Sequence, residues 1–181
     1  AVAGFCAARP GETVVDWCAG GGGKTLALAA AMAGRGRLIA RDAAPQRLAQ
    51  LAPRAARAGA SVETLAPGAS PPPADLVLVD APCSGSGAWA RNPDAKWRLT
   101  PERLAELAAT QDTVLAEAAA AVRPGGRLIY ATCSLIPAEN AARIDAVLAA
   151  RPDFAEASRR QWTPLDGGDG FFAARLDRQT A

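Results

Sequence analysis

The stretch that decides the fold runs from Thr13 to Thr25 and reads TVVDWCAGGGGKT. Its first four residues form an apolar run that ends on Asp16 and predicts a short buried strand. The glycine run 20–23 follows and leads into a helical segment from about Lys24 to Met32, which Gly34 ends. A glycine turn between strand and helix lets backbone N–H groups approach a ligand closely, so the stretch predicts a ligand-binding strand–turn–helix unit.

A second predicted strand, Arg37 to Asp42, ends on a carboxylate about 20 residues beyond that turn. An acidic side chain there can accept both hydroxyls of a ribose, so turn and acid together predict an adenosine-type cofactor site. Two alternatives remain open. The glycines can serve strand–helix packing alone. GGGGKT also approaches the P-loop of nucleotidases, with LVLVD (76–80) as their magnesium-binding strand, although Cys18 stands where that motif begins with glycine.

The rest of the chain alternates short Val, Leu and Ile runs with longer Ala- and Leu-rich segments of helical period, the pattern of βα units and a parallel sheet. The further strands are expected at Ser61 to Leu65, Leu76 to Asp80, Arg127 to Thr132 and Gly170 to Leu176. Helices are expected from about Pro45, kinked or ended by Pro53, from Thr100 to the Pro124–Gly126 turn, and from Pro137 to Ala150. The segments 67–73 and 81–99 are expected to be loops. We found no internal repeat or linker, so residues 1–181 are expected to form one domain.

Composition narrows the class of protein. Half of the 181 residues are apolar, which is enough for one core, and no apolar run approaches the ~20 residues that cross a bilayer. The start of the chain lacks the layout of a signal peptide, so we expect an intracellular, cytoplasmic protein without membrane contact. The formal charge of +2 gives no global attraction to nucleic acid, although the basic residues are almost all arginine.

The chain contains four cysteines and no histidine. The lack of histidine excludes Ser-His-Asp and Cys-His catalysis and every zinc site that needs histidine, and we expect no metal. No two cysteines form a C-x-x-C pair, so free thiols are expected. Any nucleophile must therefore be activated by other groups.

Two of the cysteines directly follow predicted strands. Cys83 lies in DAPCSG and Cys133 in TCS, so both should face the crevice at the carboxyl ends of the strands if those strands are neighbours. Methylation of cytosine at carbon 5 needs a thiolate, because addition at carbon 6 makes carbon 5 nucleophilic. Asp80 is the candidate for a hydrogen bond to ring nitrogen 3, and the helix expected from Pro137 could lower the pKa of Cys133. Alternatively, the two cysteines are small residues that pack in the protein, and Asp80 is an ordinary hydrogen-bonded carboxylate at the end of a strand.

Five motifs, in this order, resemble the RsmB/Sun family of RNA cytosine-5 methyltransferases: DWCAGGGGK (16–24), DAPCSG (80–85), NPDAKWR (92–98), PGG (124–126) and TCS (132–134). The resemblance covers nearly the whole chain. It implies a Rossmann-like class I methyltransferase fold of the α/β class, with a mostly parallel seven-stranded sheet, helices on both faces and an antiparallel last strand around Phe171. It also implies S-adenosylmethionine as cofactor and RNA, in the first place ribosomal RNA, as substrate. We expect a monomer.

The resemblance also implies roles for individual residues. Cys133 is the expected nucleophile, Cys83 assists release of the methylated base, and Asp80 contacts the cytosine and the methyl-donor region. The residues expected to bind the cofactor are Cys18, Ala19, Gly20, Gly21, Gly22, Gly23, Lys24, Asp42 and Asp80.

The chain departs from the family pattern in three places. Gly20-Gly21 stands where the family often has Ala-Pro, and Ala66-Pro67-Gly68 stands where an acid beyond the third strand usually contacts adenine. The family also usually carries an N-terminal RNA-binding extension, whereas only about ten residues precede the first predicted strand here, so we expect either an excised domain or RNA affinity from elsewhere. A non-catalytic RNA-binding module that kept the fold is therefore a further alternative.

The loop after Cys83 combines aromatic and basic side chains. An enzyme that modifies a base must receive it unstacked, with phosphate contacts around the pocket, and such side chains suit stacking and backbone binding. A solvated loop whose tryptophans cover the edge of the core is the alternative. The candidate RNA contacts are Trp89, Arg91, Lys96, Trp97 and Arg98.

Overall fold

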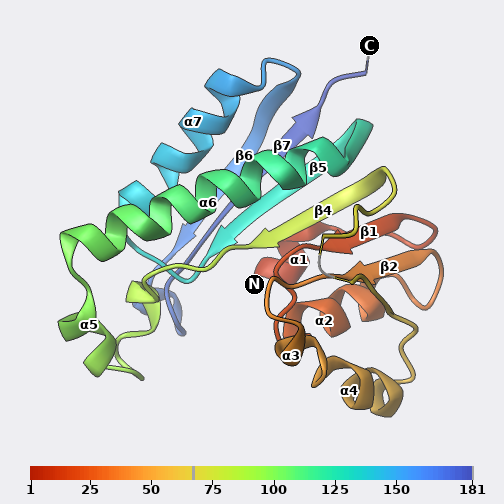
Figure 1. Ribbon diagram of the computed structural model, residues 1–181, viewed down its shortest axis with the longest axis horizontal. Helices are drawn as coiled ribbons and strands as arrows, with labels where there is room; N and C mark the ends of the chain where they lie inside the picture. Colours follow the sequence, from red (N-terminus) through yellow and green to blue (C-terminus); the bar gives the residue numbers. More distant parts are fainter. Residues whose placement is uncertain (67, 181) are drawn as a thin grey trace.

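The computed structural model describes residues 1–66 and 68–180, which form one seven-stranded sheet with the order β3-β2-β1-β4-β5-β7-β6 (Figure 1). All neighbouring strands are parallel except β7, which is antiparallel to both β5 and β6. The predicted mostly parallel sheet and its antiparallel last strand are confirmed. The bounds of the strands are Thr13–Asp16 (β1), Arg37–Ala40 (β2), Glu63–Thr64 (β3), Ala74–Asp80 (β4), Val122–Thr132 (β5), Phe154–Trp162 (β6) and Phe171–Arg178 (β7).

Helices cover both faces of the sheet (Figure 1). The α6 and α7 helices pack on one face through residues such as Leu115 and Ile144, whereas α1 and α2 pack on the other through Cys6 and Leu28. The bounds of the helices are Val2–Cys6 (α1), Gly23–Ala31 (α2), Pro45–Leu48 (α3), Leu51–Ala58 (α4), Asp94–Arg98 (α5), Pro101–Ala121 (α6) and Ala141–Ala150 (α7). Short 3-10 turns lie at Ser86–Ala88, Pro137–Glu139 and Pro164–Asp166.

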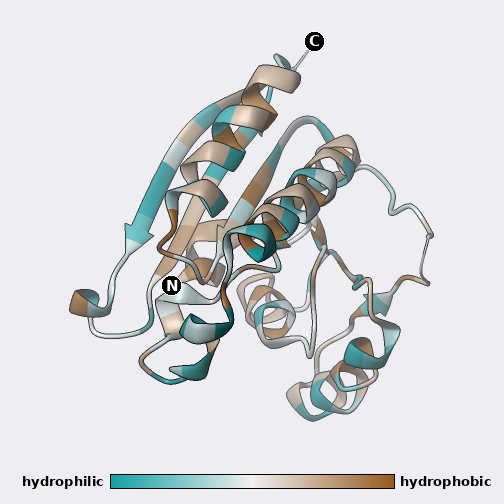
Figure 2. Cartoon of the chain, turned by 60° about the vertical axis from the view of Figure 1, so that its left-hand side comes forward, coloured by the Kyte–Doolittle hydropathy of each residue, from teal (hydrophilic) through white to brown (hydrophobic). Residues whose placement is uncertain are grey.

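The burial of β4 shows why helices must cover both faces of the sheet. Leu76 and Leu78 pack against the cluster of α1 and α2, whereas Val77 and Val79 pack against the cluster of α6 and α7. Successive strand residues point to opposite faces, so a strand that is apolar without interruption lies at the centre of a covered sheet. The edge strand β6 is by contrast largely hydrophilic (Figure 2), and its residues 157–161 are exposed.

The register of β4 against β5 positions the site. The two strands are parallel neighbours, with Asp80 opposite Ala131. Both strands therefore end at the same edge of the sheet (Figure 1), and the segments after Asp80 and Thr132 begin side by side. The condition set for Cys83 and Cys133 to face each other, that these strands are neighbours, is met.

The predicted effect of Pro53 is wrong. The helix that begins at Pro45 already ends at Leu48, and Pro53 lies in the first turn of the next helix, α4. Proline is tolerated there because the first N–H groups of a helix have no intrahelical acceptor.

Two other helix boundaries differ from the prediction. The long helix α6 ends at Ala121, and the Pro124–Gly126 segment belongs to β5, where a register shift relative to β4 accommodates it. The helix expected from Pro137 starts as a 3-10 turn, and α7 begins only at Ala141.

Sequence periodicity did not predict three of the elements, namely α1, α5 and β6. The two helices have only five residues each, too few for a helical period to be visible, and β6 is a polar edge strand without apolar alternation. Among the described residues, no helix is both long and apolar enough to cross a membrane.

Candidate active site

The glycine turn between β1 and α2 meets the acid that follows β2, as the sequence predicted. The Gly20 N–H donates to Oδ2 of Asp42 at 2.8 Å, and the Ala44 N–H donates to Oδ1 at 2.9 Å. Arg47 of α3 adds an ion pair of 3.4 Å. Asp42 is buried and is held beside the glycine turn by three groups of the chain itself.

Backbone conformation and packing each favour glycine in this turn. Gly20 and Gly22 have positive φ values of 53° and 82°, which favour glycine, and a Cβ at Gly22 would lie 2.2 Å from a methyl group of Leu51. A Cβ at Gly20 or Gly21 would meet side chains of α3 and α4. Packing against Leu51 therefore explains glycine at 22 and the positive φ favours glycine at 20, whereas a Cβ at Gly21 would meet only the ends of movable side chains and Gly23 faces open space.

The start of α2 offers donors to a ligand. Within the described part of the chain, the backbone N–H groups of Gly21, Gly23 and Lys24 have no hydrogen-bond acceptor. Free N–H groups and the positive end of the helix dipole favour a negative group at this position. The carboxylate of an amino-acid moiety, such as that of S-adenosylmethionine, fits this donor set.

Asp80 and Lys24 connect the glycine turn to the end of β4. The Nζ atom of Lys24 lies 2.7 Å from Oδ2 of Asp80, and both side chains are about three-tenths exposed. At the end of β1, Asp16 is fully buried and accepts the Thr25 hydroxyl at 2.7 Å, and burial raises the pKa of its carboxyl to about 7. The predicted cofactor residues thus gather around one edge of the sheet.

The two cysteines of the strand-end motifs lie against each other. The Sγ atoms of Cys83 and Cys133 are 3.3 Å apart, and both thiols are half-buried. The Cys83 loop is tied to the Cys133 loop because the Gly87 N–H donates to the Cys133 carbonyl at 2.9 Å. The two cysteines thus lie side by side, as the sequence predicted, whereas their access to a substrate stays a prediction.

The four cysteines differ sharply in acidity. Burial raises the pKa of Cys6 and of Cys18 to about 12. The hydrogen bond from the Cys83 thiol lowers the pKa of Cys133 to about 7, and the same bond raises the pKa of Cys83 above its ordinary value. Cys133 is thus the thiol that forms a thiolate near neutral pH.

The helix expected to activate Cys133 does not begin at Pro137. A 3-10 turn of three residues begins there, and the pKa of Cys133 is lowered by the Cys83 hydrogen bond, by a backbone N–H and by the charge of Lys24. A buried carboxylate that the sequence analysis did not select, Glu139, lies in that turn and bonds the serines that follow each cysteine. The serines were visible in both motifs, but nothing in the pattern indicated their common acceptor.

The loop between Cys83 and α6 contains the candidate RNA contacts. Trp97 is 81% exposed on α5, and the Lys96 Nζ atom lies 5.3 Å from the centre of its ring. Arg91 forms an ion pair with Asp169 of the β6–β7 loop, which joins two loops at this edge of the sheet. Trp89 is only half-exposed, and its buried ring N–H has no hydrogen-bond partner among the described residues.

Two further expectations concern the acid that contacts adenine in the family and the presence of a metal. Within Ala66-Pro67-Gly68, where the family's acid is missing, Pro67 lies outside the described residues. The described residues contain no group of three or more His, Cys, Asp or Glu side chains with the geometry of a metal site.

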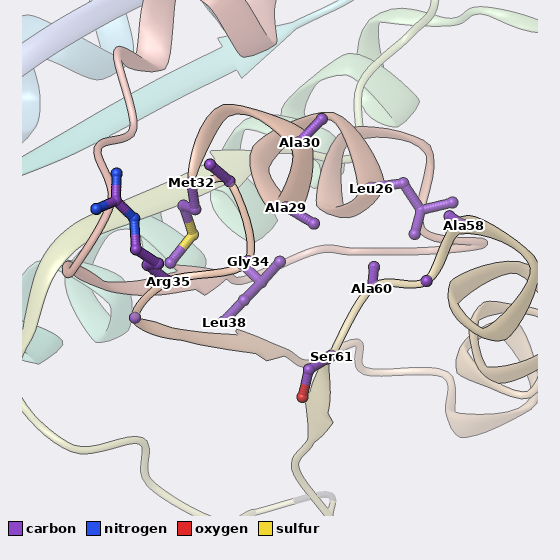
Figure 3. Close-up of a pocket in the computed structure, with 13 residues that line it drawn as sticks. Leu26, Ala29, Ala30, Met32, Gly34, Arg35, Leu38, Ala58, Ala60 and Ser61 are labelled. Atoms are coloured by element: carbon purple, nitrogen blue, oxygen red, sulfur yellow. The ribbon is translucent and has the colours of Figure 1, made fainter.

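An apolar cavity of about 250 Å³ lies away from the cysteines, between α2, β2 and the link from α4 to β3 (Figure 3). Leu26, Met32 and Leu38 line it together with several alanines. None of the predicted site residues lines this cavity. The candidate chemistry therefore belongs to the sheet edge with the glycine turn and the two cysteines.

Comparison with solved structures defines the class of the protein. The chain is 34% identical to the protein in the crystal structure of PH0851, with a TM-score of 0.93 over 98% of this chain and 45% of that chain. The structure of NSun6 from Pyrococcus horikoshii with SFG has a TM-score of 0.88 at 24% identity, over 99% of this chain and 51% of that chain. Strand order and these neighbours show a Rossmann-like class I methyltransferase fold.

The family follows from the sequence comparisons. The family model described as "16S rRNA methyltransferase RsmB/F" matches residues 5–177, so the chain belongs to the RsmB/F family. It is 37% identical over 188 residues to the ribosomal RNA small subunit methyltransferase B of Erwinia tasmaniensis, covering 96% of this chain and 44% of the relative. The chain thus spans less than half the length of that curated relative.

Proposed function

We propose that this chain transfers a methyl group from S-adenosylmethionine to carbon 5 of a cytosine in ribosomal RNA, through a covalent adduct with Cys133. One observation carries the proposal: the Sγ atoms of Cys83 and Cys133 lie 3.3 Å apart, and the pKa of Cys133 is lowered to about 7. Membership of the RsmB/F family supports the ribosomal RNA substrate.

The chemistry assigns a step to each thiol. The Cys133 thiolate adds to carbon 6 of the ring, which makes carbon 5 the nucleophile. S-adenosylmethionine supplies the methyl group when bound. Release then requires transfer of the carbon 5 proton to a base, while the bond between sulfur and carbon 6 breaks and its electron pair returns to the Cys133 sulfur. Cys83, 3.3 Å from that sulfur, is the residue proposed to assist the proton transfer. Asp80, held by Lys24, is the residue proposed to contact the cytosine ring.

The cofactor is proposed to bind along the glycine turn. The free N–H groups at the start of α2 would hold its carboxylate, and Asp42 beside Gly20 would accept its ribose hydroxyls. The backbone N–H groups that reach Asp42 leave each carboxylate oxygen a second acceptor site, and on Oδ2 a ribose hydroxyl would share that site with the guanidinium of Arg47. The proposed contact set is therefore Cys18 to Lys24, Asp42 and Asp80.

RNA is proposed to approach over the 89–98 segment. The exposed ring of Trp97 offers a stacking surface beside Lys96, and Arg98 lies in the same helix. Such a surface suits a nucleotide that is displaced from its neighbours. The monomeric state, the cytoplasmic location and the assignment of 1–181 as one domain stay predictions.

The two alternatives are less well supported. A P-loop nucleotidase would need a glycine at Cys18, and the family match favours methyl transfer. A non-catalytic RNA-binding module would have no use for a paired thiol with a lowered pKa.

The test is calorimetric titration of the 181-residue chain with S-adenosylmethionine and, separately, with ATP and magnesium, followed by transfer of a labelled methyl group to 16S ribosomal RNA. We expect binding of S-adenosylmethionine alone and 5-methylcytosine in the digested RNA. Binding of ATP alone would replace the proposal with the nucleotidase. Binding of RNA without transfer would favour the non-catalytic module.

A further inference from the structure

Glu139 is a fully buried carboxylate between the two cysteine loops. Its Oε1 atom accepts the Ser84 backbone N–H at 2.8 Å and the Gln111 side-chain amide at 3.1 Å. Its Oε2 atom accepts the hydroxyls of Ser84 and Ser134, each at 2.5 Å. One side chain therefore bonds the residue that follows Cys83 and the residue that follows Cys133.

The surrounding bonds fix the carboxylate itself. The Tyr130 hydroxyl donates to the Glu139 carbonyl at 2.7 Å, and Gln111 also donates to the Pro82 carbonyl at 2.9 Å. Among the described residues, no lysine or arginine forms an ion pair with Glu139. Burying a carboxylate is costly unless donors satisfy it, so the four donors must stay in place for the loops to keep their positions.

We propose that Glu139 is a positioning residue that holds the two loops together, so that the Cys83 and Cys133 thiols stay in hydrogen-bond contact. Glu139 does not touch the sulfur atoms and acts through Ser84 and Ser134. The catalytic value of this geometry rests on the proposed function, whereas the geometry itself can be tested without cofactor or RNA.

The test is the pH dependence of Cys133 alkylation by iodoacetamide, measured for each cysteine by peptide mass spectrometry in the 181-residue chain. The pKa of Cys133 is about 7, and loss of the Cys83 hydrogen bond shifts it toward the ordinary value of 9.0. Glu139→Ala is expected to move the midpoint upward, and Glu139→Gln, which keeps the Oε1 acceptor, to move it less. The other ionisable groups near Cys133, namely Asp80, Lys24 and Arg91, are unchanged in these variants. The charge of Glu139 raises the pKa of Cys83, so its loss alone would act against the expected upward shift, and the serine variants, which keep the charge, are free of this effect.

Controls separate positioning from general damage. Glu117→Ala removes a half-exposed glutamate of α6 and should leave the midpoint unchanged. Ser84→Ala and Ser134→Ala each remove one hydroxyl and leave the carboxylate in place, so they decide the question even where Glu139→Ala fails to fold. Upward shifts in the serine variants support the proposal. A wild-type midpoint in folded Glu139→Gln and in both serine variants would overturn it, whether or not the chain methylates RNA.

Discussion

The sulfur atoms of Cys83 and Cys133 are 3.3 Å apart although 50 positions separate the residues in the chain. They meet because β4 and β5 are parallel neighbours and each cysteine follows its strand by one to three residues. The close contact lowers the pKa of Cys133 and raises that of Cys83. The two thiols are therefore not interchangeable, and their removal should have different consequences.

Cys133→Ala should abolish methyl transfer, because no thiolate remains to add to carbon 6. Cys83→Ala should instead accumulate an enzyme–RNA adduct, because release is impaired after the sulfur–carbon bond has formed. The measurement is denaturing gel electrophoresis with labelled RNA, beside a transfer assay. Cys6→Ala, which changes a buried thiol under α1, is the control and should turn over normally. Normal turnover by Cys83→Ala would show that the role proposed for Cys83 is wrong.

Cys83→Ala should also shift the pH profile of Cys133. The thiolate fraction rises as pH increases through the pKa, which is about 7 while the Cys83 thiol donates to the sulfur. Without this donor the thiolate is less stable, so the pKa rises toward 9.0 and less thiolate is present at pH 7. Alkylation rates of Cys133 measured from pH 6 to 10 should differ most near neutral pH and converge at the alkaline end. Superimposed profiles would mean that another group stabilises the thiolate.

Arg54→Ala should weaken binding of S-adenosylmethionine, because Arg54 of α4 donates to the Gly21 carbonyl and so fixes the glycine turn. Loss of about 1 kcal/mol corresponds to a roughly five-fold weaker affinity. The measurement is calorimetric titration with the cofactor, together with the melting temperature of the ligand-free chain.

A second arginine of the same helix provides a matched control. Arg57 is exposed near the end of α4 and forms no hydrogen bond or ion pair with the described residues. Arg57→Ala should therefore leave the affinity for the cofactor and the melting temperature unchanged. An equal loss of affinity in both variants would contradict the role of Arg54 at the glycine turn.

Arg127→Met should destabilise the domain strongly. Arg127 is 8% exposed, forms two bonds to Glu12 and donates to the carbonyls of Cys6 and Ala7, so it attaches α1 to β5. Removing one partner of a buried ion pair costs about 3–5 kcal/mol. Arg123→Met, at a half-exposed pair with Asp75, is the control and should cost about 1 kcal/mol or less. Urea denaturation of the two variants measures how much unfolding free energy each one loses. Equal denaturation midpoints would refute the predicted difference.

Local patterns predicted the elements that position the site. The TVVD and LVLVD runs were assigned as strands because uninterrupted apolar residues suit a sheet covered on both faces, and the glycine run marked the turn before α2. Pro53 and the Pro124–Gly126 segment misled the prediction, since their effect depends on position within an element and on the neighbouring strand. The polar strand β6 has no apolar signal and is held by β7.

By itself, the sequence determined that two cysteines follow two strands and that a glycine turn precedes an acid, and its motifs indicated a family. The tertiary structure alone decided that the two thiols perturb each other's pKa, because that depends on the 3.3 Å contact between sulfur atoms of different loops. It also decided that Arg54 and Leu51 occupy the space beside the glycines, and that Glu139 joins Ser84 to Ser134. Hydrogen bonds and burial are properties of neighbours in space, and neighbours separated by 50 positions become visible only when the sheet is assembled.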